Sequence, residues 1–156
     1  MATPARLMTN AVAREVLADH QVQLSAGRCT FVYKRVRPGT LLVTISGYDT
    51  GQFGTSTLDE IRMELVREKT LELFVDAREA LGPVVSVSDE WTRFFTNNRG
   101  SLRRVSVLVG SKVVHLTIAI AQHLSRTGDL IQIYSDPETF AARVAAATPS
   151  VVQSFR

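Results

Sequence analysis

Cysteine is nearly absent from this chain of 156 residues, because Cys29 is the only one. A single thiol cannot form an internal disulfide or a cysteine cage around a metal ion, and it fits a reducing, cytoplasmic compartment. Long apolar runs are absent as well. The densest, residues 113–121, is interrupted by His115 and Thr117 and is far shorter than the roughly 18 residues that span a membrane. The first ten residues lack a basic patch followed by an apolar block, so we expect neither a secretory signal nor membrane insertion.

Acidic residues are missing from residues 91–128, which carry six basic residues, whereas residues 59–90 carry nine acids against four bases. One flank of the protein should therefore be acidic and another basic, which favours the orientation of a charged partner. We expect no nucleic acid, because the net charge is only +3 and no binding motif accompanies the arginines. The histidines are scattered, with His115 and His123 eight residues apart, so we expect no metal site.

The chain has the length of one domain, and 45% of its residues are hydrophobic, which is enough for a core of its own. We divide it into a lead-in of residues 1–28, a domain of residues 29–147 and a tail of residues 148–156. Within the lead-in, the apolar spacing of residues 12–17 predicts a short amphipathic helix, and Gly27 ends it.

The rest of the chain alternates between strand and helix patterns. Period-two alternation predicts strands at residues 30–35, 40–46, 71–76, 104–109 and 130–135. Helical spacing predicts helices at residues 57–69, 89–98, 111–126 and 137–147. The expected caps are Thr57 with Glu60 in a capping box, Ser88, Ser111, and Asp136 before Pro137. The order β-β-α-β-α-β-α-β-α predicts an α/β fold with a mixed, mostly parallel sheet.

The two faces of the predicted sheet differ in polarity. One set of alternating positions, such as Leu41, Val43 and Ile45, is wholly apolar, whereas the opposite set mixes apolar and polar side chains. A parallel sheet with helices on both faces is apolar on both. We therefore expect the helices mainly on one face, and the N-terminal segment, a partner or water on the other.

Three phrases in this pattern, LELFVDARE, SLRRVSVLVGSKVVHLTIAIAQHL and IQIYSDPETFAARV, resemble the SpoIIAA-like or STAS family (sulfate transporter and anti-sigma factor antagonist), which has Sec14-type relatives. The resemblance covers roughly residues 30–144. It implies a STAS-like fold and a non-enzymatic regulatory module of bacterial signalling that binds a protein partner. The family's anti-sigma antagonists are phosphorylated on a serine directly after the third strand. Here a predicted loop, residues 77–85, separates that strand from the first serines, Ser86 and Ser88, which are the possible phosphosites.

The candidate partner-binding surface is the loop-rich end that follows the parallel strands, where open α/β sheets usually place their sites. It comprises residues 48–56 and 78–88, and its candidate residues are Tyr48, Asp49, Thr50, Gln52, Phe53, Arg78, Ser86 and Ser88. Glycines before a helix can also expose backbone N–H groups to an anion, but this loop lacks the lysine and the spacing of a phosphate loop. A plain loop with partner contacts and a nucleotide-binding loop both stay open.

The predicted helix at residues 111–126 is apolar over most of its circumference, which indicates burial on more than one side. Flanking helices could bury it. Alternatively, Val114, Ile118 and Ala121 could form a dimer interface or line a groove for a lipid-like ligand. Together with the mixed sheet face, this surface predicts a homodimer. Trp91, Phe94 and Phe95 have the spacing of ordinary helix packing and are expected in the core.

No activated nucleophile or acid–base pair is visible. Cys29 has no base near it in the sequence and is expected to be an inert thiol. The sequence therefore predicts no catalytic residues, no cofactor and a protein-interaction module, with a carrier or binder of a small apolar or nucleotide-like ligand as the alternative.

Overall fold

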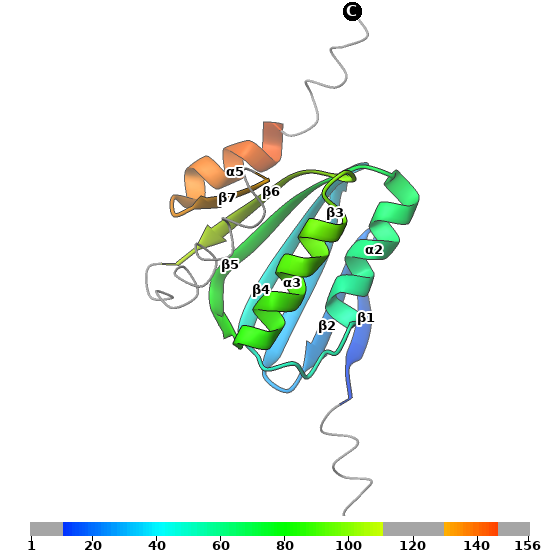
Figure 1. Ribbon diagram of the computed structural model, residues 1–156, viewed down its shortest axis with the longest axis vertical. Coiled ribbons are helices and arrows are strands. Elements are labelled where there is room, and N and C mark those ends of the chain that lie inside the picture. The colour runs from blue at the N-terminus through cyan, green and yellow to red at the C-terminus, as the bar shows by residue number, and fades with distance from the viewer. Residues whose placement is uncertain (1–10, 111–129, 147–156) are drawn as a thin grey trace, which may run out of the picture.

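The computed structural model describes residues 11–110 and 130–146 (Figure 1). Its centre is a seven-stranded sheet in which the strands lie side by side in the order in which they occur along the chain. The strands are β1 (Ala13–Ala18), β2 (Gln21–Ala26), β3 (Cys29–Arg37), β4 (Thr40–Asp49), β5 (Leu71–Pro83), β6 (Leu102–Val109) and β7 (Ile131–Tyr134). The described helices are α2 (Ser56–Glu68), α3 (Val85–Asn97) and α5 (Pro137–Ala146).

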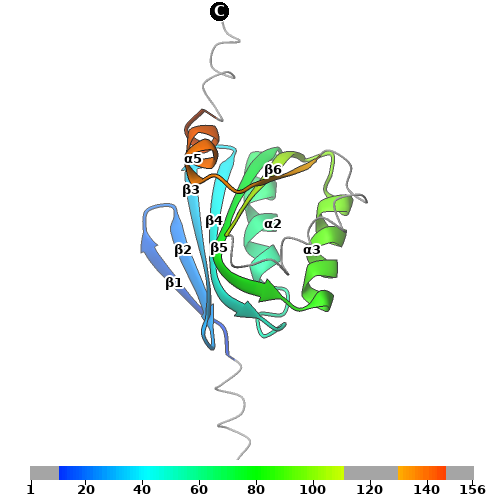
Figure 2. The same ribbon diagram turned by 90° about the vertical axis from the view of Figure 1, so that its left-hand side faces the viewer.

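The sheet is mixed, as predicted. Neighbouring strands from β1 to β4 are antiparallel, and neighbouring strands from β4 to β7 are parallel. Parallel neighbours need a crossover, and the helices α2 and α3 supply the first two. Because the strand order follows the chain, both crossovers bring their helix to the same face of the sheet (Figure 2). The parallel part therefore begins at β4, and everything before it is antiparallel.

The apolar strand positions lie under α2 and α3, which confirms the expected polarity of that face. Its central residues are buried together in one hydrophobic core, among them Leu41, Val43, Leu73, Val75 and Val105. Each fully buried side chain of this size contributes roughly 1.5–3 kcal/mol relative to leaving it exposed. The core between the sheet and these two helices is thus the main source of stability.

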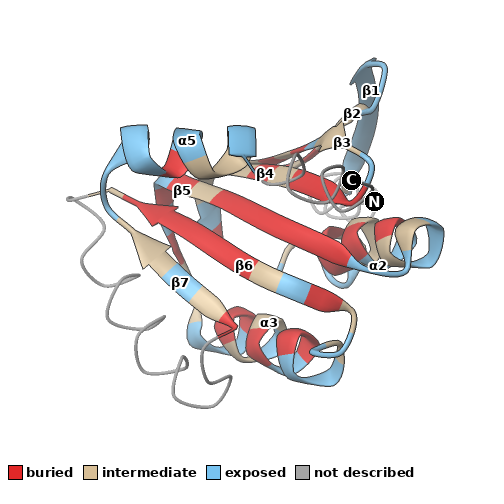
Figure 3. Ribbon diagram, turned by 90° about the horizontal axis from the view of Figure 1, so that it is seen from above, coloured by how far each residue is buried: buried red, intermediate tan, exposed pale blue. Residues whose placement is uncertain are grey.

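The opposite face is covered in part by α5 (Figure 3). Phe140 of α5 lies edge-on to Phe74 at 5.7 Å between ring centroids, and Leu108 completes this second cluster. The expectation that the mixed face meets the N-terminal segment, a partner or water is therefore wrong over β5 and β6. Asp136 caps α5 as predicted, because its carboxylate accepts the backbone N–H groups of Glu138 and Thr139.

The predicted N-terminal helix at residues 12–17 is wrong, because β1 and β2 form a hairpin there. His20 turns that hairpin with φ at 64°, and Gly27 turns the next with φ at 63°. Leu24 of β2 is 2% exposed and belongs to the main core. Since β2 pairs with β3, a boundary between residues 28 and 29 would separate two strands of one sheet.

The predicted capping box at the start of α2 is also wrong. The helix begins at Ser56 after Thr55, and the Thr55 hydroxyl bonds the Asp59 carboxylate at 2.9 Å. Glu60, the expected second half of the box, instead accepts a hydrogen bond from Arg14 of β1 at 2.7 Å. Glu60 therefore forms a long-range ion pair with Arg14 and not the predicted capping contact with Thr57.

β5 is longer than predicted and α3 begins earlier. The expected loop at residues 77–85 is strand up to Pro83, because β4 continues to Asp49 and pairs with it. Val84 is the residue before α3, so Ser88 is not the cap; its backbone N–H donates to the Val84 carbonyl inside the helix. Both phosphoserine candidates, Ser86 and Ser88, therefore lie at the start of α3, which begins two residues after β5 ends.

A second ion pair, besides that of Arg14 with Glu60, ties α2 to the antiparallel part of the sheet. Glu64 is 8% exposed and accepts two hydrogen bonds from the Arg35 guanidinium of β3, which also lies 2.9 Å from His20 Nδ1. We expect Glu64→Ala to lower the free energy of unfolding by about 2–3 kcal/mol, because the half-buried guanidinium loses its partner. Urea unfolding would measure it. Asp59→Ala, which breaks an exposed pair with Arg62 and an exposed hydrogen bond from the Thr55 hydroxyl, should cost less, at most about 1 kcal/mol.

Candidate functional site

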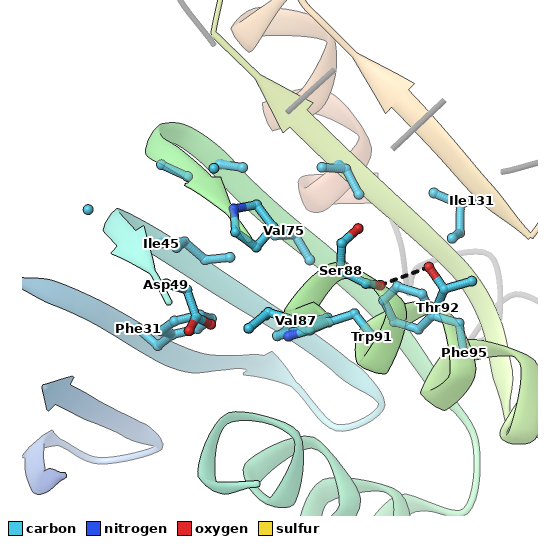
Figure 4. A pocket seen from close by; sticks show the side chains of 16 residues that line it. Phe31, Ile45, Asp49, Val75, Val87, Ser88, Trp91, Thr92, Phe95 and Ile131 are labelled. Carbon is cyan, nitrogen blue, oxygen red and sulfur yellow. Dashed lines mark hydrogen bonds between the residues drawn. The ribbon is translucent and has the colours of Figure 1, made fainter. Parts of the chain in front are cut away.

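A pocket lies where β4 and β5 end, between the sheet and α3 (Figure 4). Its volume is about 110 Å³. The walls are almost wholly apolar and come from β3, β4, β5, α3, β6 and β7. The side chains labelled in Figure 4 are Phe31, Ile45, Asp49, Val75, Val87, Ser88, Trp91, Thr92, Phe95 and Ile131. The pocket thus occupies the end of the sheet at which the candidate site was predicted.

Aromatic side chains form one wall of this pocket. Phe31 of β3 stacks on Trp91 of α3, with ring centroids 6.2 Å apart, and meets the edge of Phe53 at 5.0 Å. Trp91 in turn meets Phe95 one turn along the helix at 5.8 Å. Phe94 and Phe95 are buried and Trp91 packs against the core, which confirms the predicted core role of these three residues. Trp91 and Phe95 serve the pocket as well.

Asp49 is the charged side chain among the pocket residues. It ends β4, is 5% exposed, and its carboxylate accepts the Gly51 N–H at 3.0 Å. Its backbone carbonyl accepts the Val84 N–H, which fixes the start of α3 beside it. Burial raises the pKa of the Asp49 carboxyl; the Gly51 hydrogen bond opposes this shift, and the negative charge of Glu90 adds to it.

The raised pKa of Asp49 predicts how stability changes with pH. The folded state binds the proton more tightly than the unfolded state, so this group stabilises the fold below its unfolded pKa and loses that contribution as pH rises through the folded pKa. We therefore expect Asp49→Asn to be at least as stable as the parent at pH 7. The difference should shrink on acidification below the ordinary aspartate pKa. Thermal unfolding of both proteins between pH 3 and pH 7 tests this, and a parent more stable at pH 7 would contradict it.

The structure divides the predicted partner-binding residues into two groups. Tyr48, Thr50, Arg78 and Ser86 are exposed, and Gln52 is half-buried in the loop. Asp49, Phe53 and Ser88 are buried, so they are not available as direct surface contacts. Val114, Ile118 and Ala121 lie outside the described residues, as do His115 and His123.

Two exposed apolar side chains belong to this end of the sheet and were not singled out from the sequence. Leu81 of β5 is 65% exposed, and Val85, the first residue of α3, is 73% exposed. They are close in sequence to Gly82, which pairs with Tyr48 of β4. The apolar residues within the expected loop, residues 77–85, could have indicated these exposed side chains. If that segment is a strand, alternate side chains must point outward.

The glycine-rich loop after β4 uses its polar groups internally. The Thr50 N–H and hydroxyl both donate to the Gln52 side-chain carbonyl, and the Gly54 N–H donates to the Gly51 carbonyl. The Gln52 amide nitrogen donates to the Tyr48 carbonyl at 3.1 Å. Several of the N–H groups that a phosphate would need are therefore already engaged, with Gly51 bonded to Asp49.

Cys29 is buried beside this loop, and burial together with the charge of Asp49 raises the pKa of its thiol to about 12. A thiolate is therefore strongly disfavoured there. Within residues 11–110 and 130–146, no three His, Cys, Asp or Glu side chains are grouped as metal ligands. In the same part of the chain, no helix combines the length and the apolar character needed to cross a membrane.

Comparison with known proteins confirms the fold. A similar solved structure is that of an uncharacterised protein of the DUF3478 family from Shewanella loihica PV-4, described as having a SpoIIAA-like fold. The two chains are 13% identical, with a TM-score of 0.55 over 74% of this chain and 93% of that one. No family model and no curated protein matches this sequence. The chain therefore has a SpoIIAA-like fold, in agreement with the resemblance noted in its sequence.

Proposed function

We propose that the chain is a non-enzymatic protein-interaction module with a regulatory role in bacterial signalling. The surface that we assign to the partner is the exposed apolar end of the sheet, defined by Tyr48, Leu81 and Val85. The supporting observation is that these three large apolar side chains are 46%, 65% and 73% exposed at one end of the fold. Apolar side chains gathered at a surface are typical of protein contacts.

Polar groups suited to orienting a partner surround this apolar end. Arg78 is half exposed, and its guanidinium is held by Asp76 at 2.8 Å. Ser86 is exposed in the first turn of α3, where a phosphate would meet the positive end of the helix dipole. Phosphorylation of Ser86 is therefore the more accessible of the two predicted modifications, and Ser88, 9% exposed, is the less accessible.

The test is affinity capture from the source cytosol with quantitative mass spectrometry. We expect one or more proteins to be enriched by the parent and lost with the double variant Tyr48→Ser and Leu81→Ser. The matched control is Met63→Ser with Val66→Ser, which removes two exposed apolar side chains from α2 instead. Enrichment that survives the first pair, or that the α2 pair abolishes equally, would refute this surface.

A second candidate function, binding of a small apolar ligand, is favoured by the pocket beside α3. A cavity of about 150 Å³ lined by aliphatic and aromatic side chains can hold a benzene-sized molecule, and this pocket is of the same order at about 110 Å³. We expect cyclopentanol to raise the melting temperature of the parent. Val87→Phe, which fills the pocket, should abolish the shift, whereas Val66→Phe on the outer face of α2 should leave it unchanged. No shift in the parent would remove this candidate.

The predicted homodimer stays a prediction. The mixed sheet face offers less apolar surface to a second copy than the sequence indicated, because Phe74 and Leu108 on that face are buried under α5. Sedimentation at tens of micromolar would detect the dimer.

A further inference from the structure

The pocket beside α3 combines an apolar cavity with a buried carboxylate. The cavity favours an apolar ligand, whereas the carboxylate favours a positively charged or hydrogen-bond-donating group. Transfer of an ionised carboxylate into apolar surroundings is costly unless a cation or several hydrogen bonds compensate it. Asp49 accepts one hydrogen bond, from Gly51, and the described part of the chain brings no lysine or arginine into ion-pair distance of it. The second carboxylate oxygen, Oδ2, accepts no hydrogen bond from the described residues and is accessible from outside, so it is open to a donor on a ligand.

The surroundings of Asp49 favour a positive charge. Glu90 of α3 adds a second negative charge close enough to affect the Asp49 carboxyl. Phe31 and Trp91 present π-systems to the same pocket, and the faces of aromatic rings attract cations. An anionic head group, such as a phosphate or a fatty-acid carboxylate, would meet repulsion from the Asp49 carboxylate.

The volume of the pocket limits the body of the ligand. At about 110 Å³ the cavity is smaller than one that holds benzene, so two acyl chains do not fit within the described walls. Val87 of α3 and Ile45 of β4 also line the pocket (Figure 4). A compact hydrocarbon body no larger than a five-carbon ring satisfies this volume.

We propose that the pocket binds a small primary ammonium compound with a compact apolar body. The ammonium group donates to the second carboxylate oxygen of Asp49, and the body lies against the aromatic wall of Phe31 and Trp91, with Val87 beside it. This inference rests on the ligand-binding candidate above and specifies its ligand. It is independent of the partner surface on Tyr48 and Leu81.

The experiment compares cyclopentylamine with cyclopentanol, which has the same shape and no charge at neutral pH. Trp91 is the only tryptophan in the chain, so its fluorescence reports binding in the pocket directly. We expect the parent to bind the ammonium compound at least tenfold more tightly than the alcohol. Asp49→Asn should bind both compounds equally, and Glu90→Gln, which leaves the pocket carboxylate in place, should retain a preference of at least threefold.

The possible results separate the two proposals. Equal affinities in the parent, or a preference that persists in Asp49→Asn, would refute the ammonium ligand and leave an apolar-ligand pocket. Binding of neither compound to the parent would refute both. Melting curves of each variant, taken alongside, establish that a loss of preference comes from a folded protein.

Discussion

Gly47→Ala should leave little folded protein. Gly47 lies in β4 with φ at 92°, and a Cβ atom there would stand 2.3 Å from the Arg28 carbonyl oxygen and 2.9 Å from the Cys29 Cα. Both atoms belong to the neighbouring backbone, which cannot turn away as a side chain would. Because the clash adds to a backbone conformation that side chains rarely adopt, we expect a loss of about 4 kcal/mol or more. Circular dichroism and urea unfolding would measure it.

Gly54→Ala is the matched control for this prediction. Gly54 also has a positive φ, of 59°, but a Cβ atom there meets nothing within 4 Å. The substitution therefore carries the conformational cost alone, about 1–2 kcal/mol. Similar losses for the two variants would show that the approach of β4 to the start of β3 is not as close as described.

Phe31→Ala should be the most damaging truncation in the aromatic wall. Phe31 is 1% exposed and contacts the rings of Tyr33, Phe53 and Trp91. Loss of a buried phenyl ring costs about 3–5 kcal/mol, because the transfer free energy is lost and a cavity remains. The new cavity would join the existing pocket, since Phe31 is one of its walls.

Phe31→Leu keeps most of the buried volume and should cost less than about 2 kcal/mol. Chemical denaturation followed by circular dichroism compares the two variants without relying on Trp91, whose surroundings change with the substitution. A Phe31→Ala protein as stable as Phe31→Leu would mean that the ring contributes no packing of its own. In that case the wall would be held by Trp91 and Phe53 alone.

The sheet core could be predicted from the sequence because its strands alternate over buried positions. Val43, Leu73 and Val105 each mark the apolar face of a strand, and all three are fully buried. β1 gave no such signal, since all six of its residues are exposed. The spacing of Val12, Val16 and Leu17 fitted a helix equally well. An edge strand is defined by its backbone pairing, which leaves little pattern in the side chains.

The sequence predicted the end of the sheet at which the pocket lies, but not the apolar character of that pocket. Asp49 and Tyr48 are adjacent in sequence, and alternation along β4 places one in the pocket and leaves the other 46% exposed. The desolvation of Asp49 depends on Phe31 and Val87, which come from other elements, so no local pattern could indicate it. The end of β5 was not predicted either, because it contains Gly82 and Pro83, two residues that usually mark loops.

The agreement of strand order with chain order has a consequence for how the molecule folds. Each strand from β2 onward finds its partner in the strand made immediately before it, so no pairing waits for a distant segment. The four antiparallel strands need only short turns, whereas β5 can join only after α2 has crossed over. Contacts close in sequence form with a small loss of chain entropy and speed folding. We expect the sheet to grow from the β1–β4 meander toward β7, in the direction in which a ribosome releases the chain.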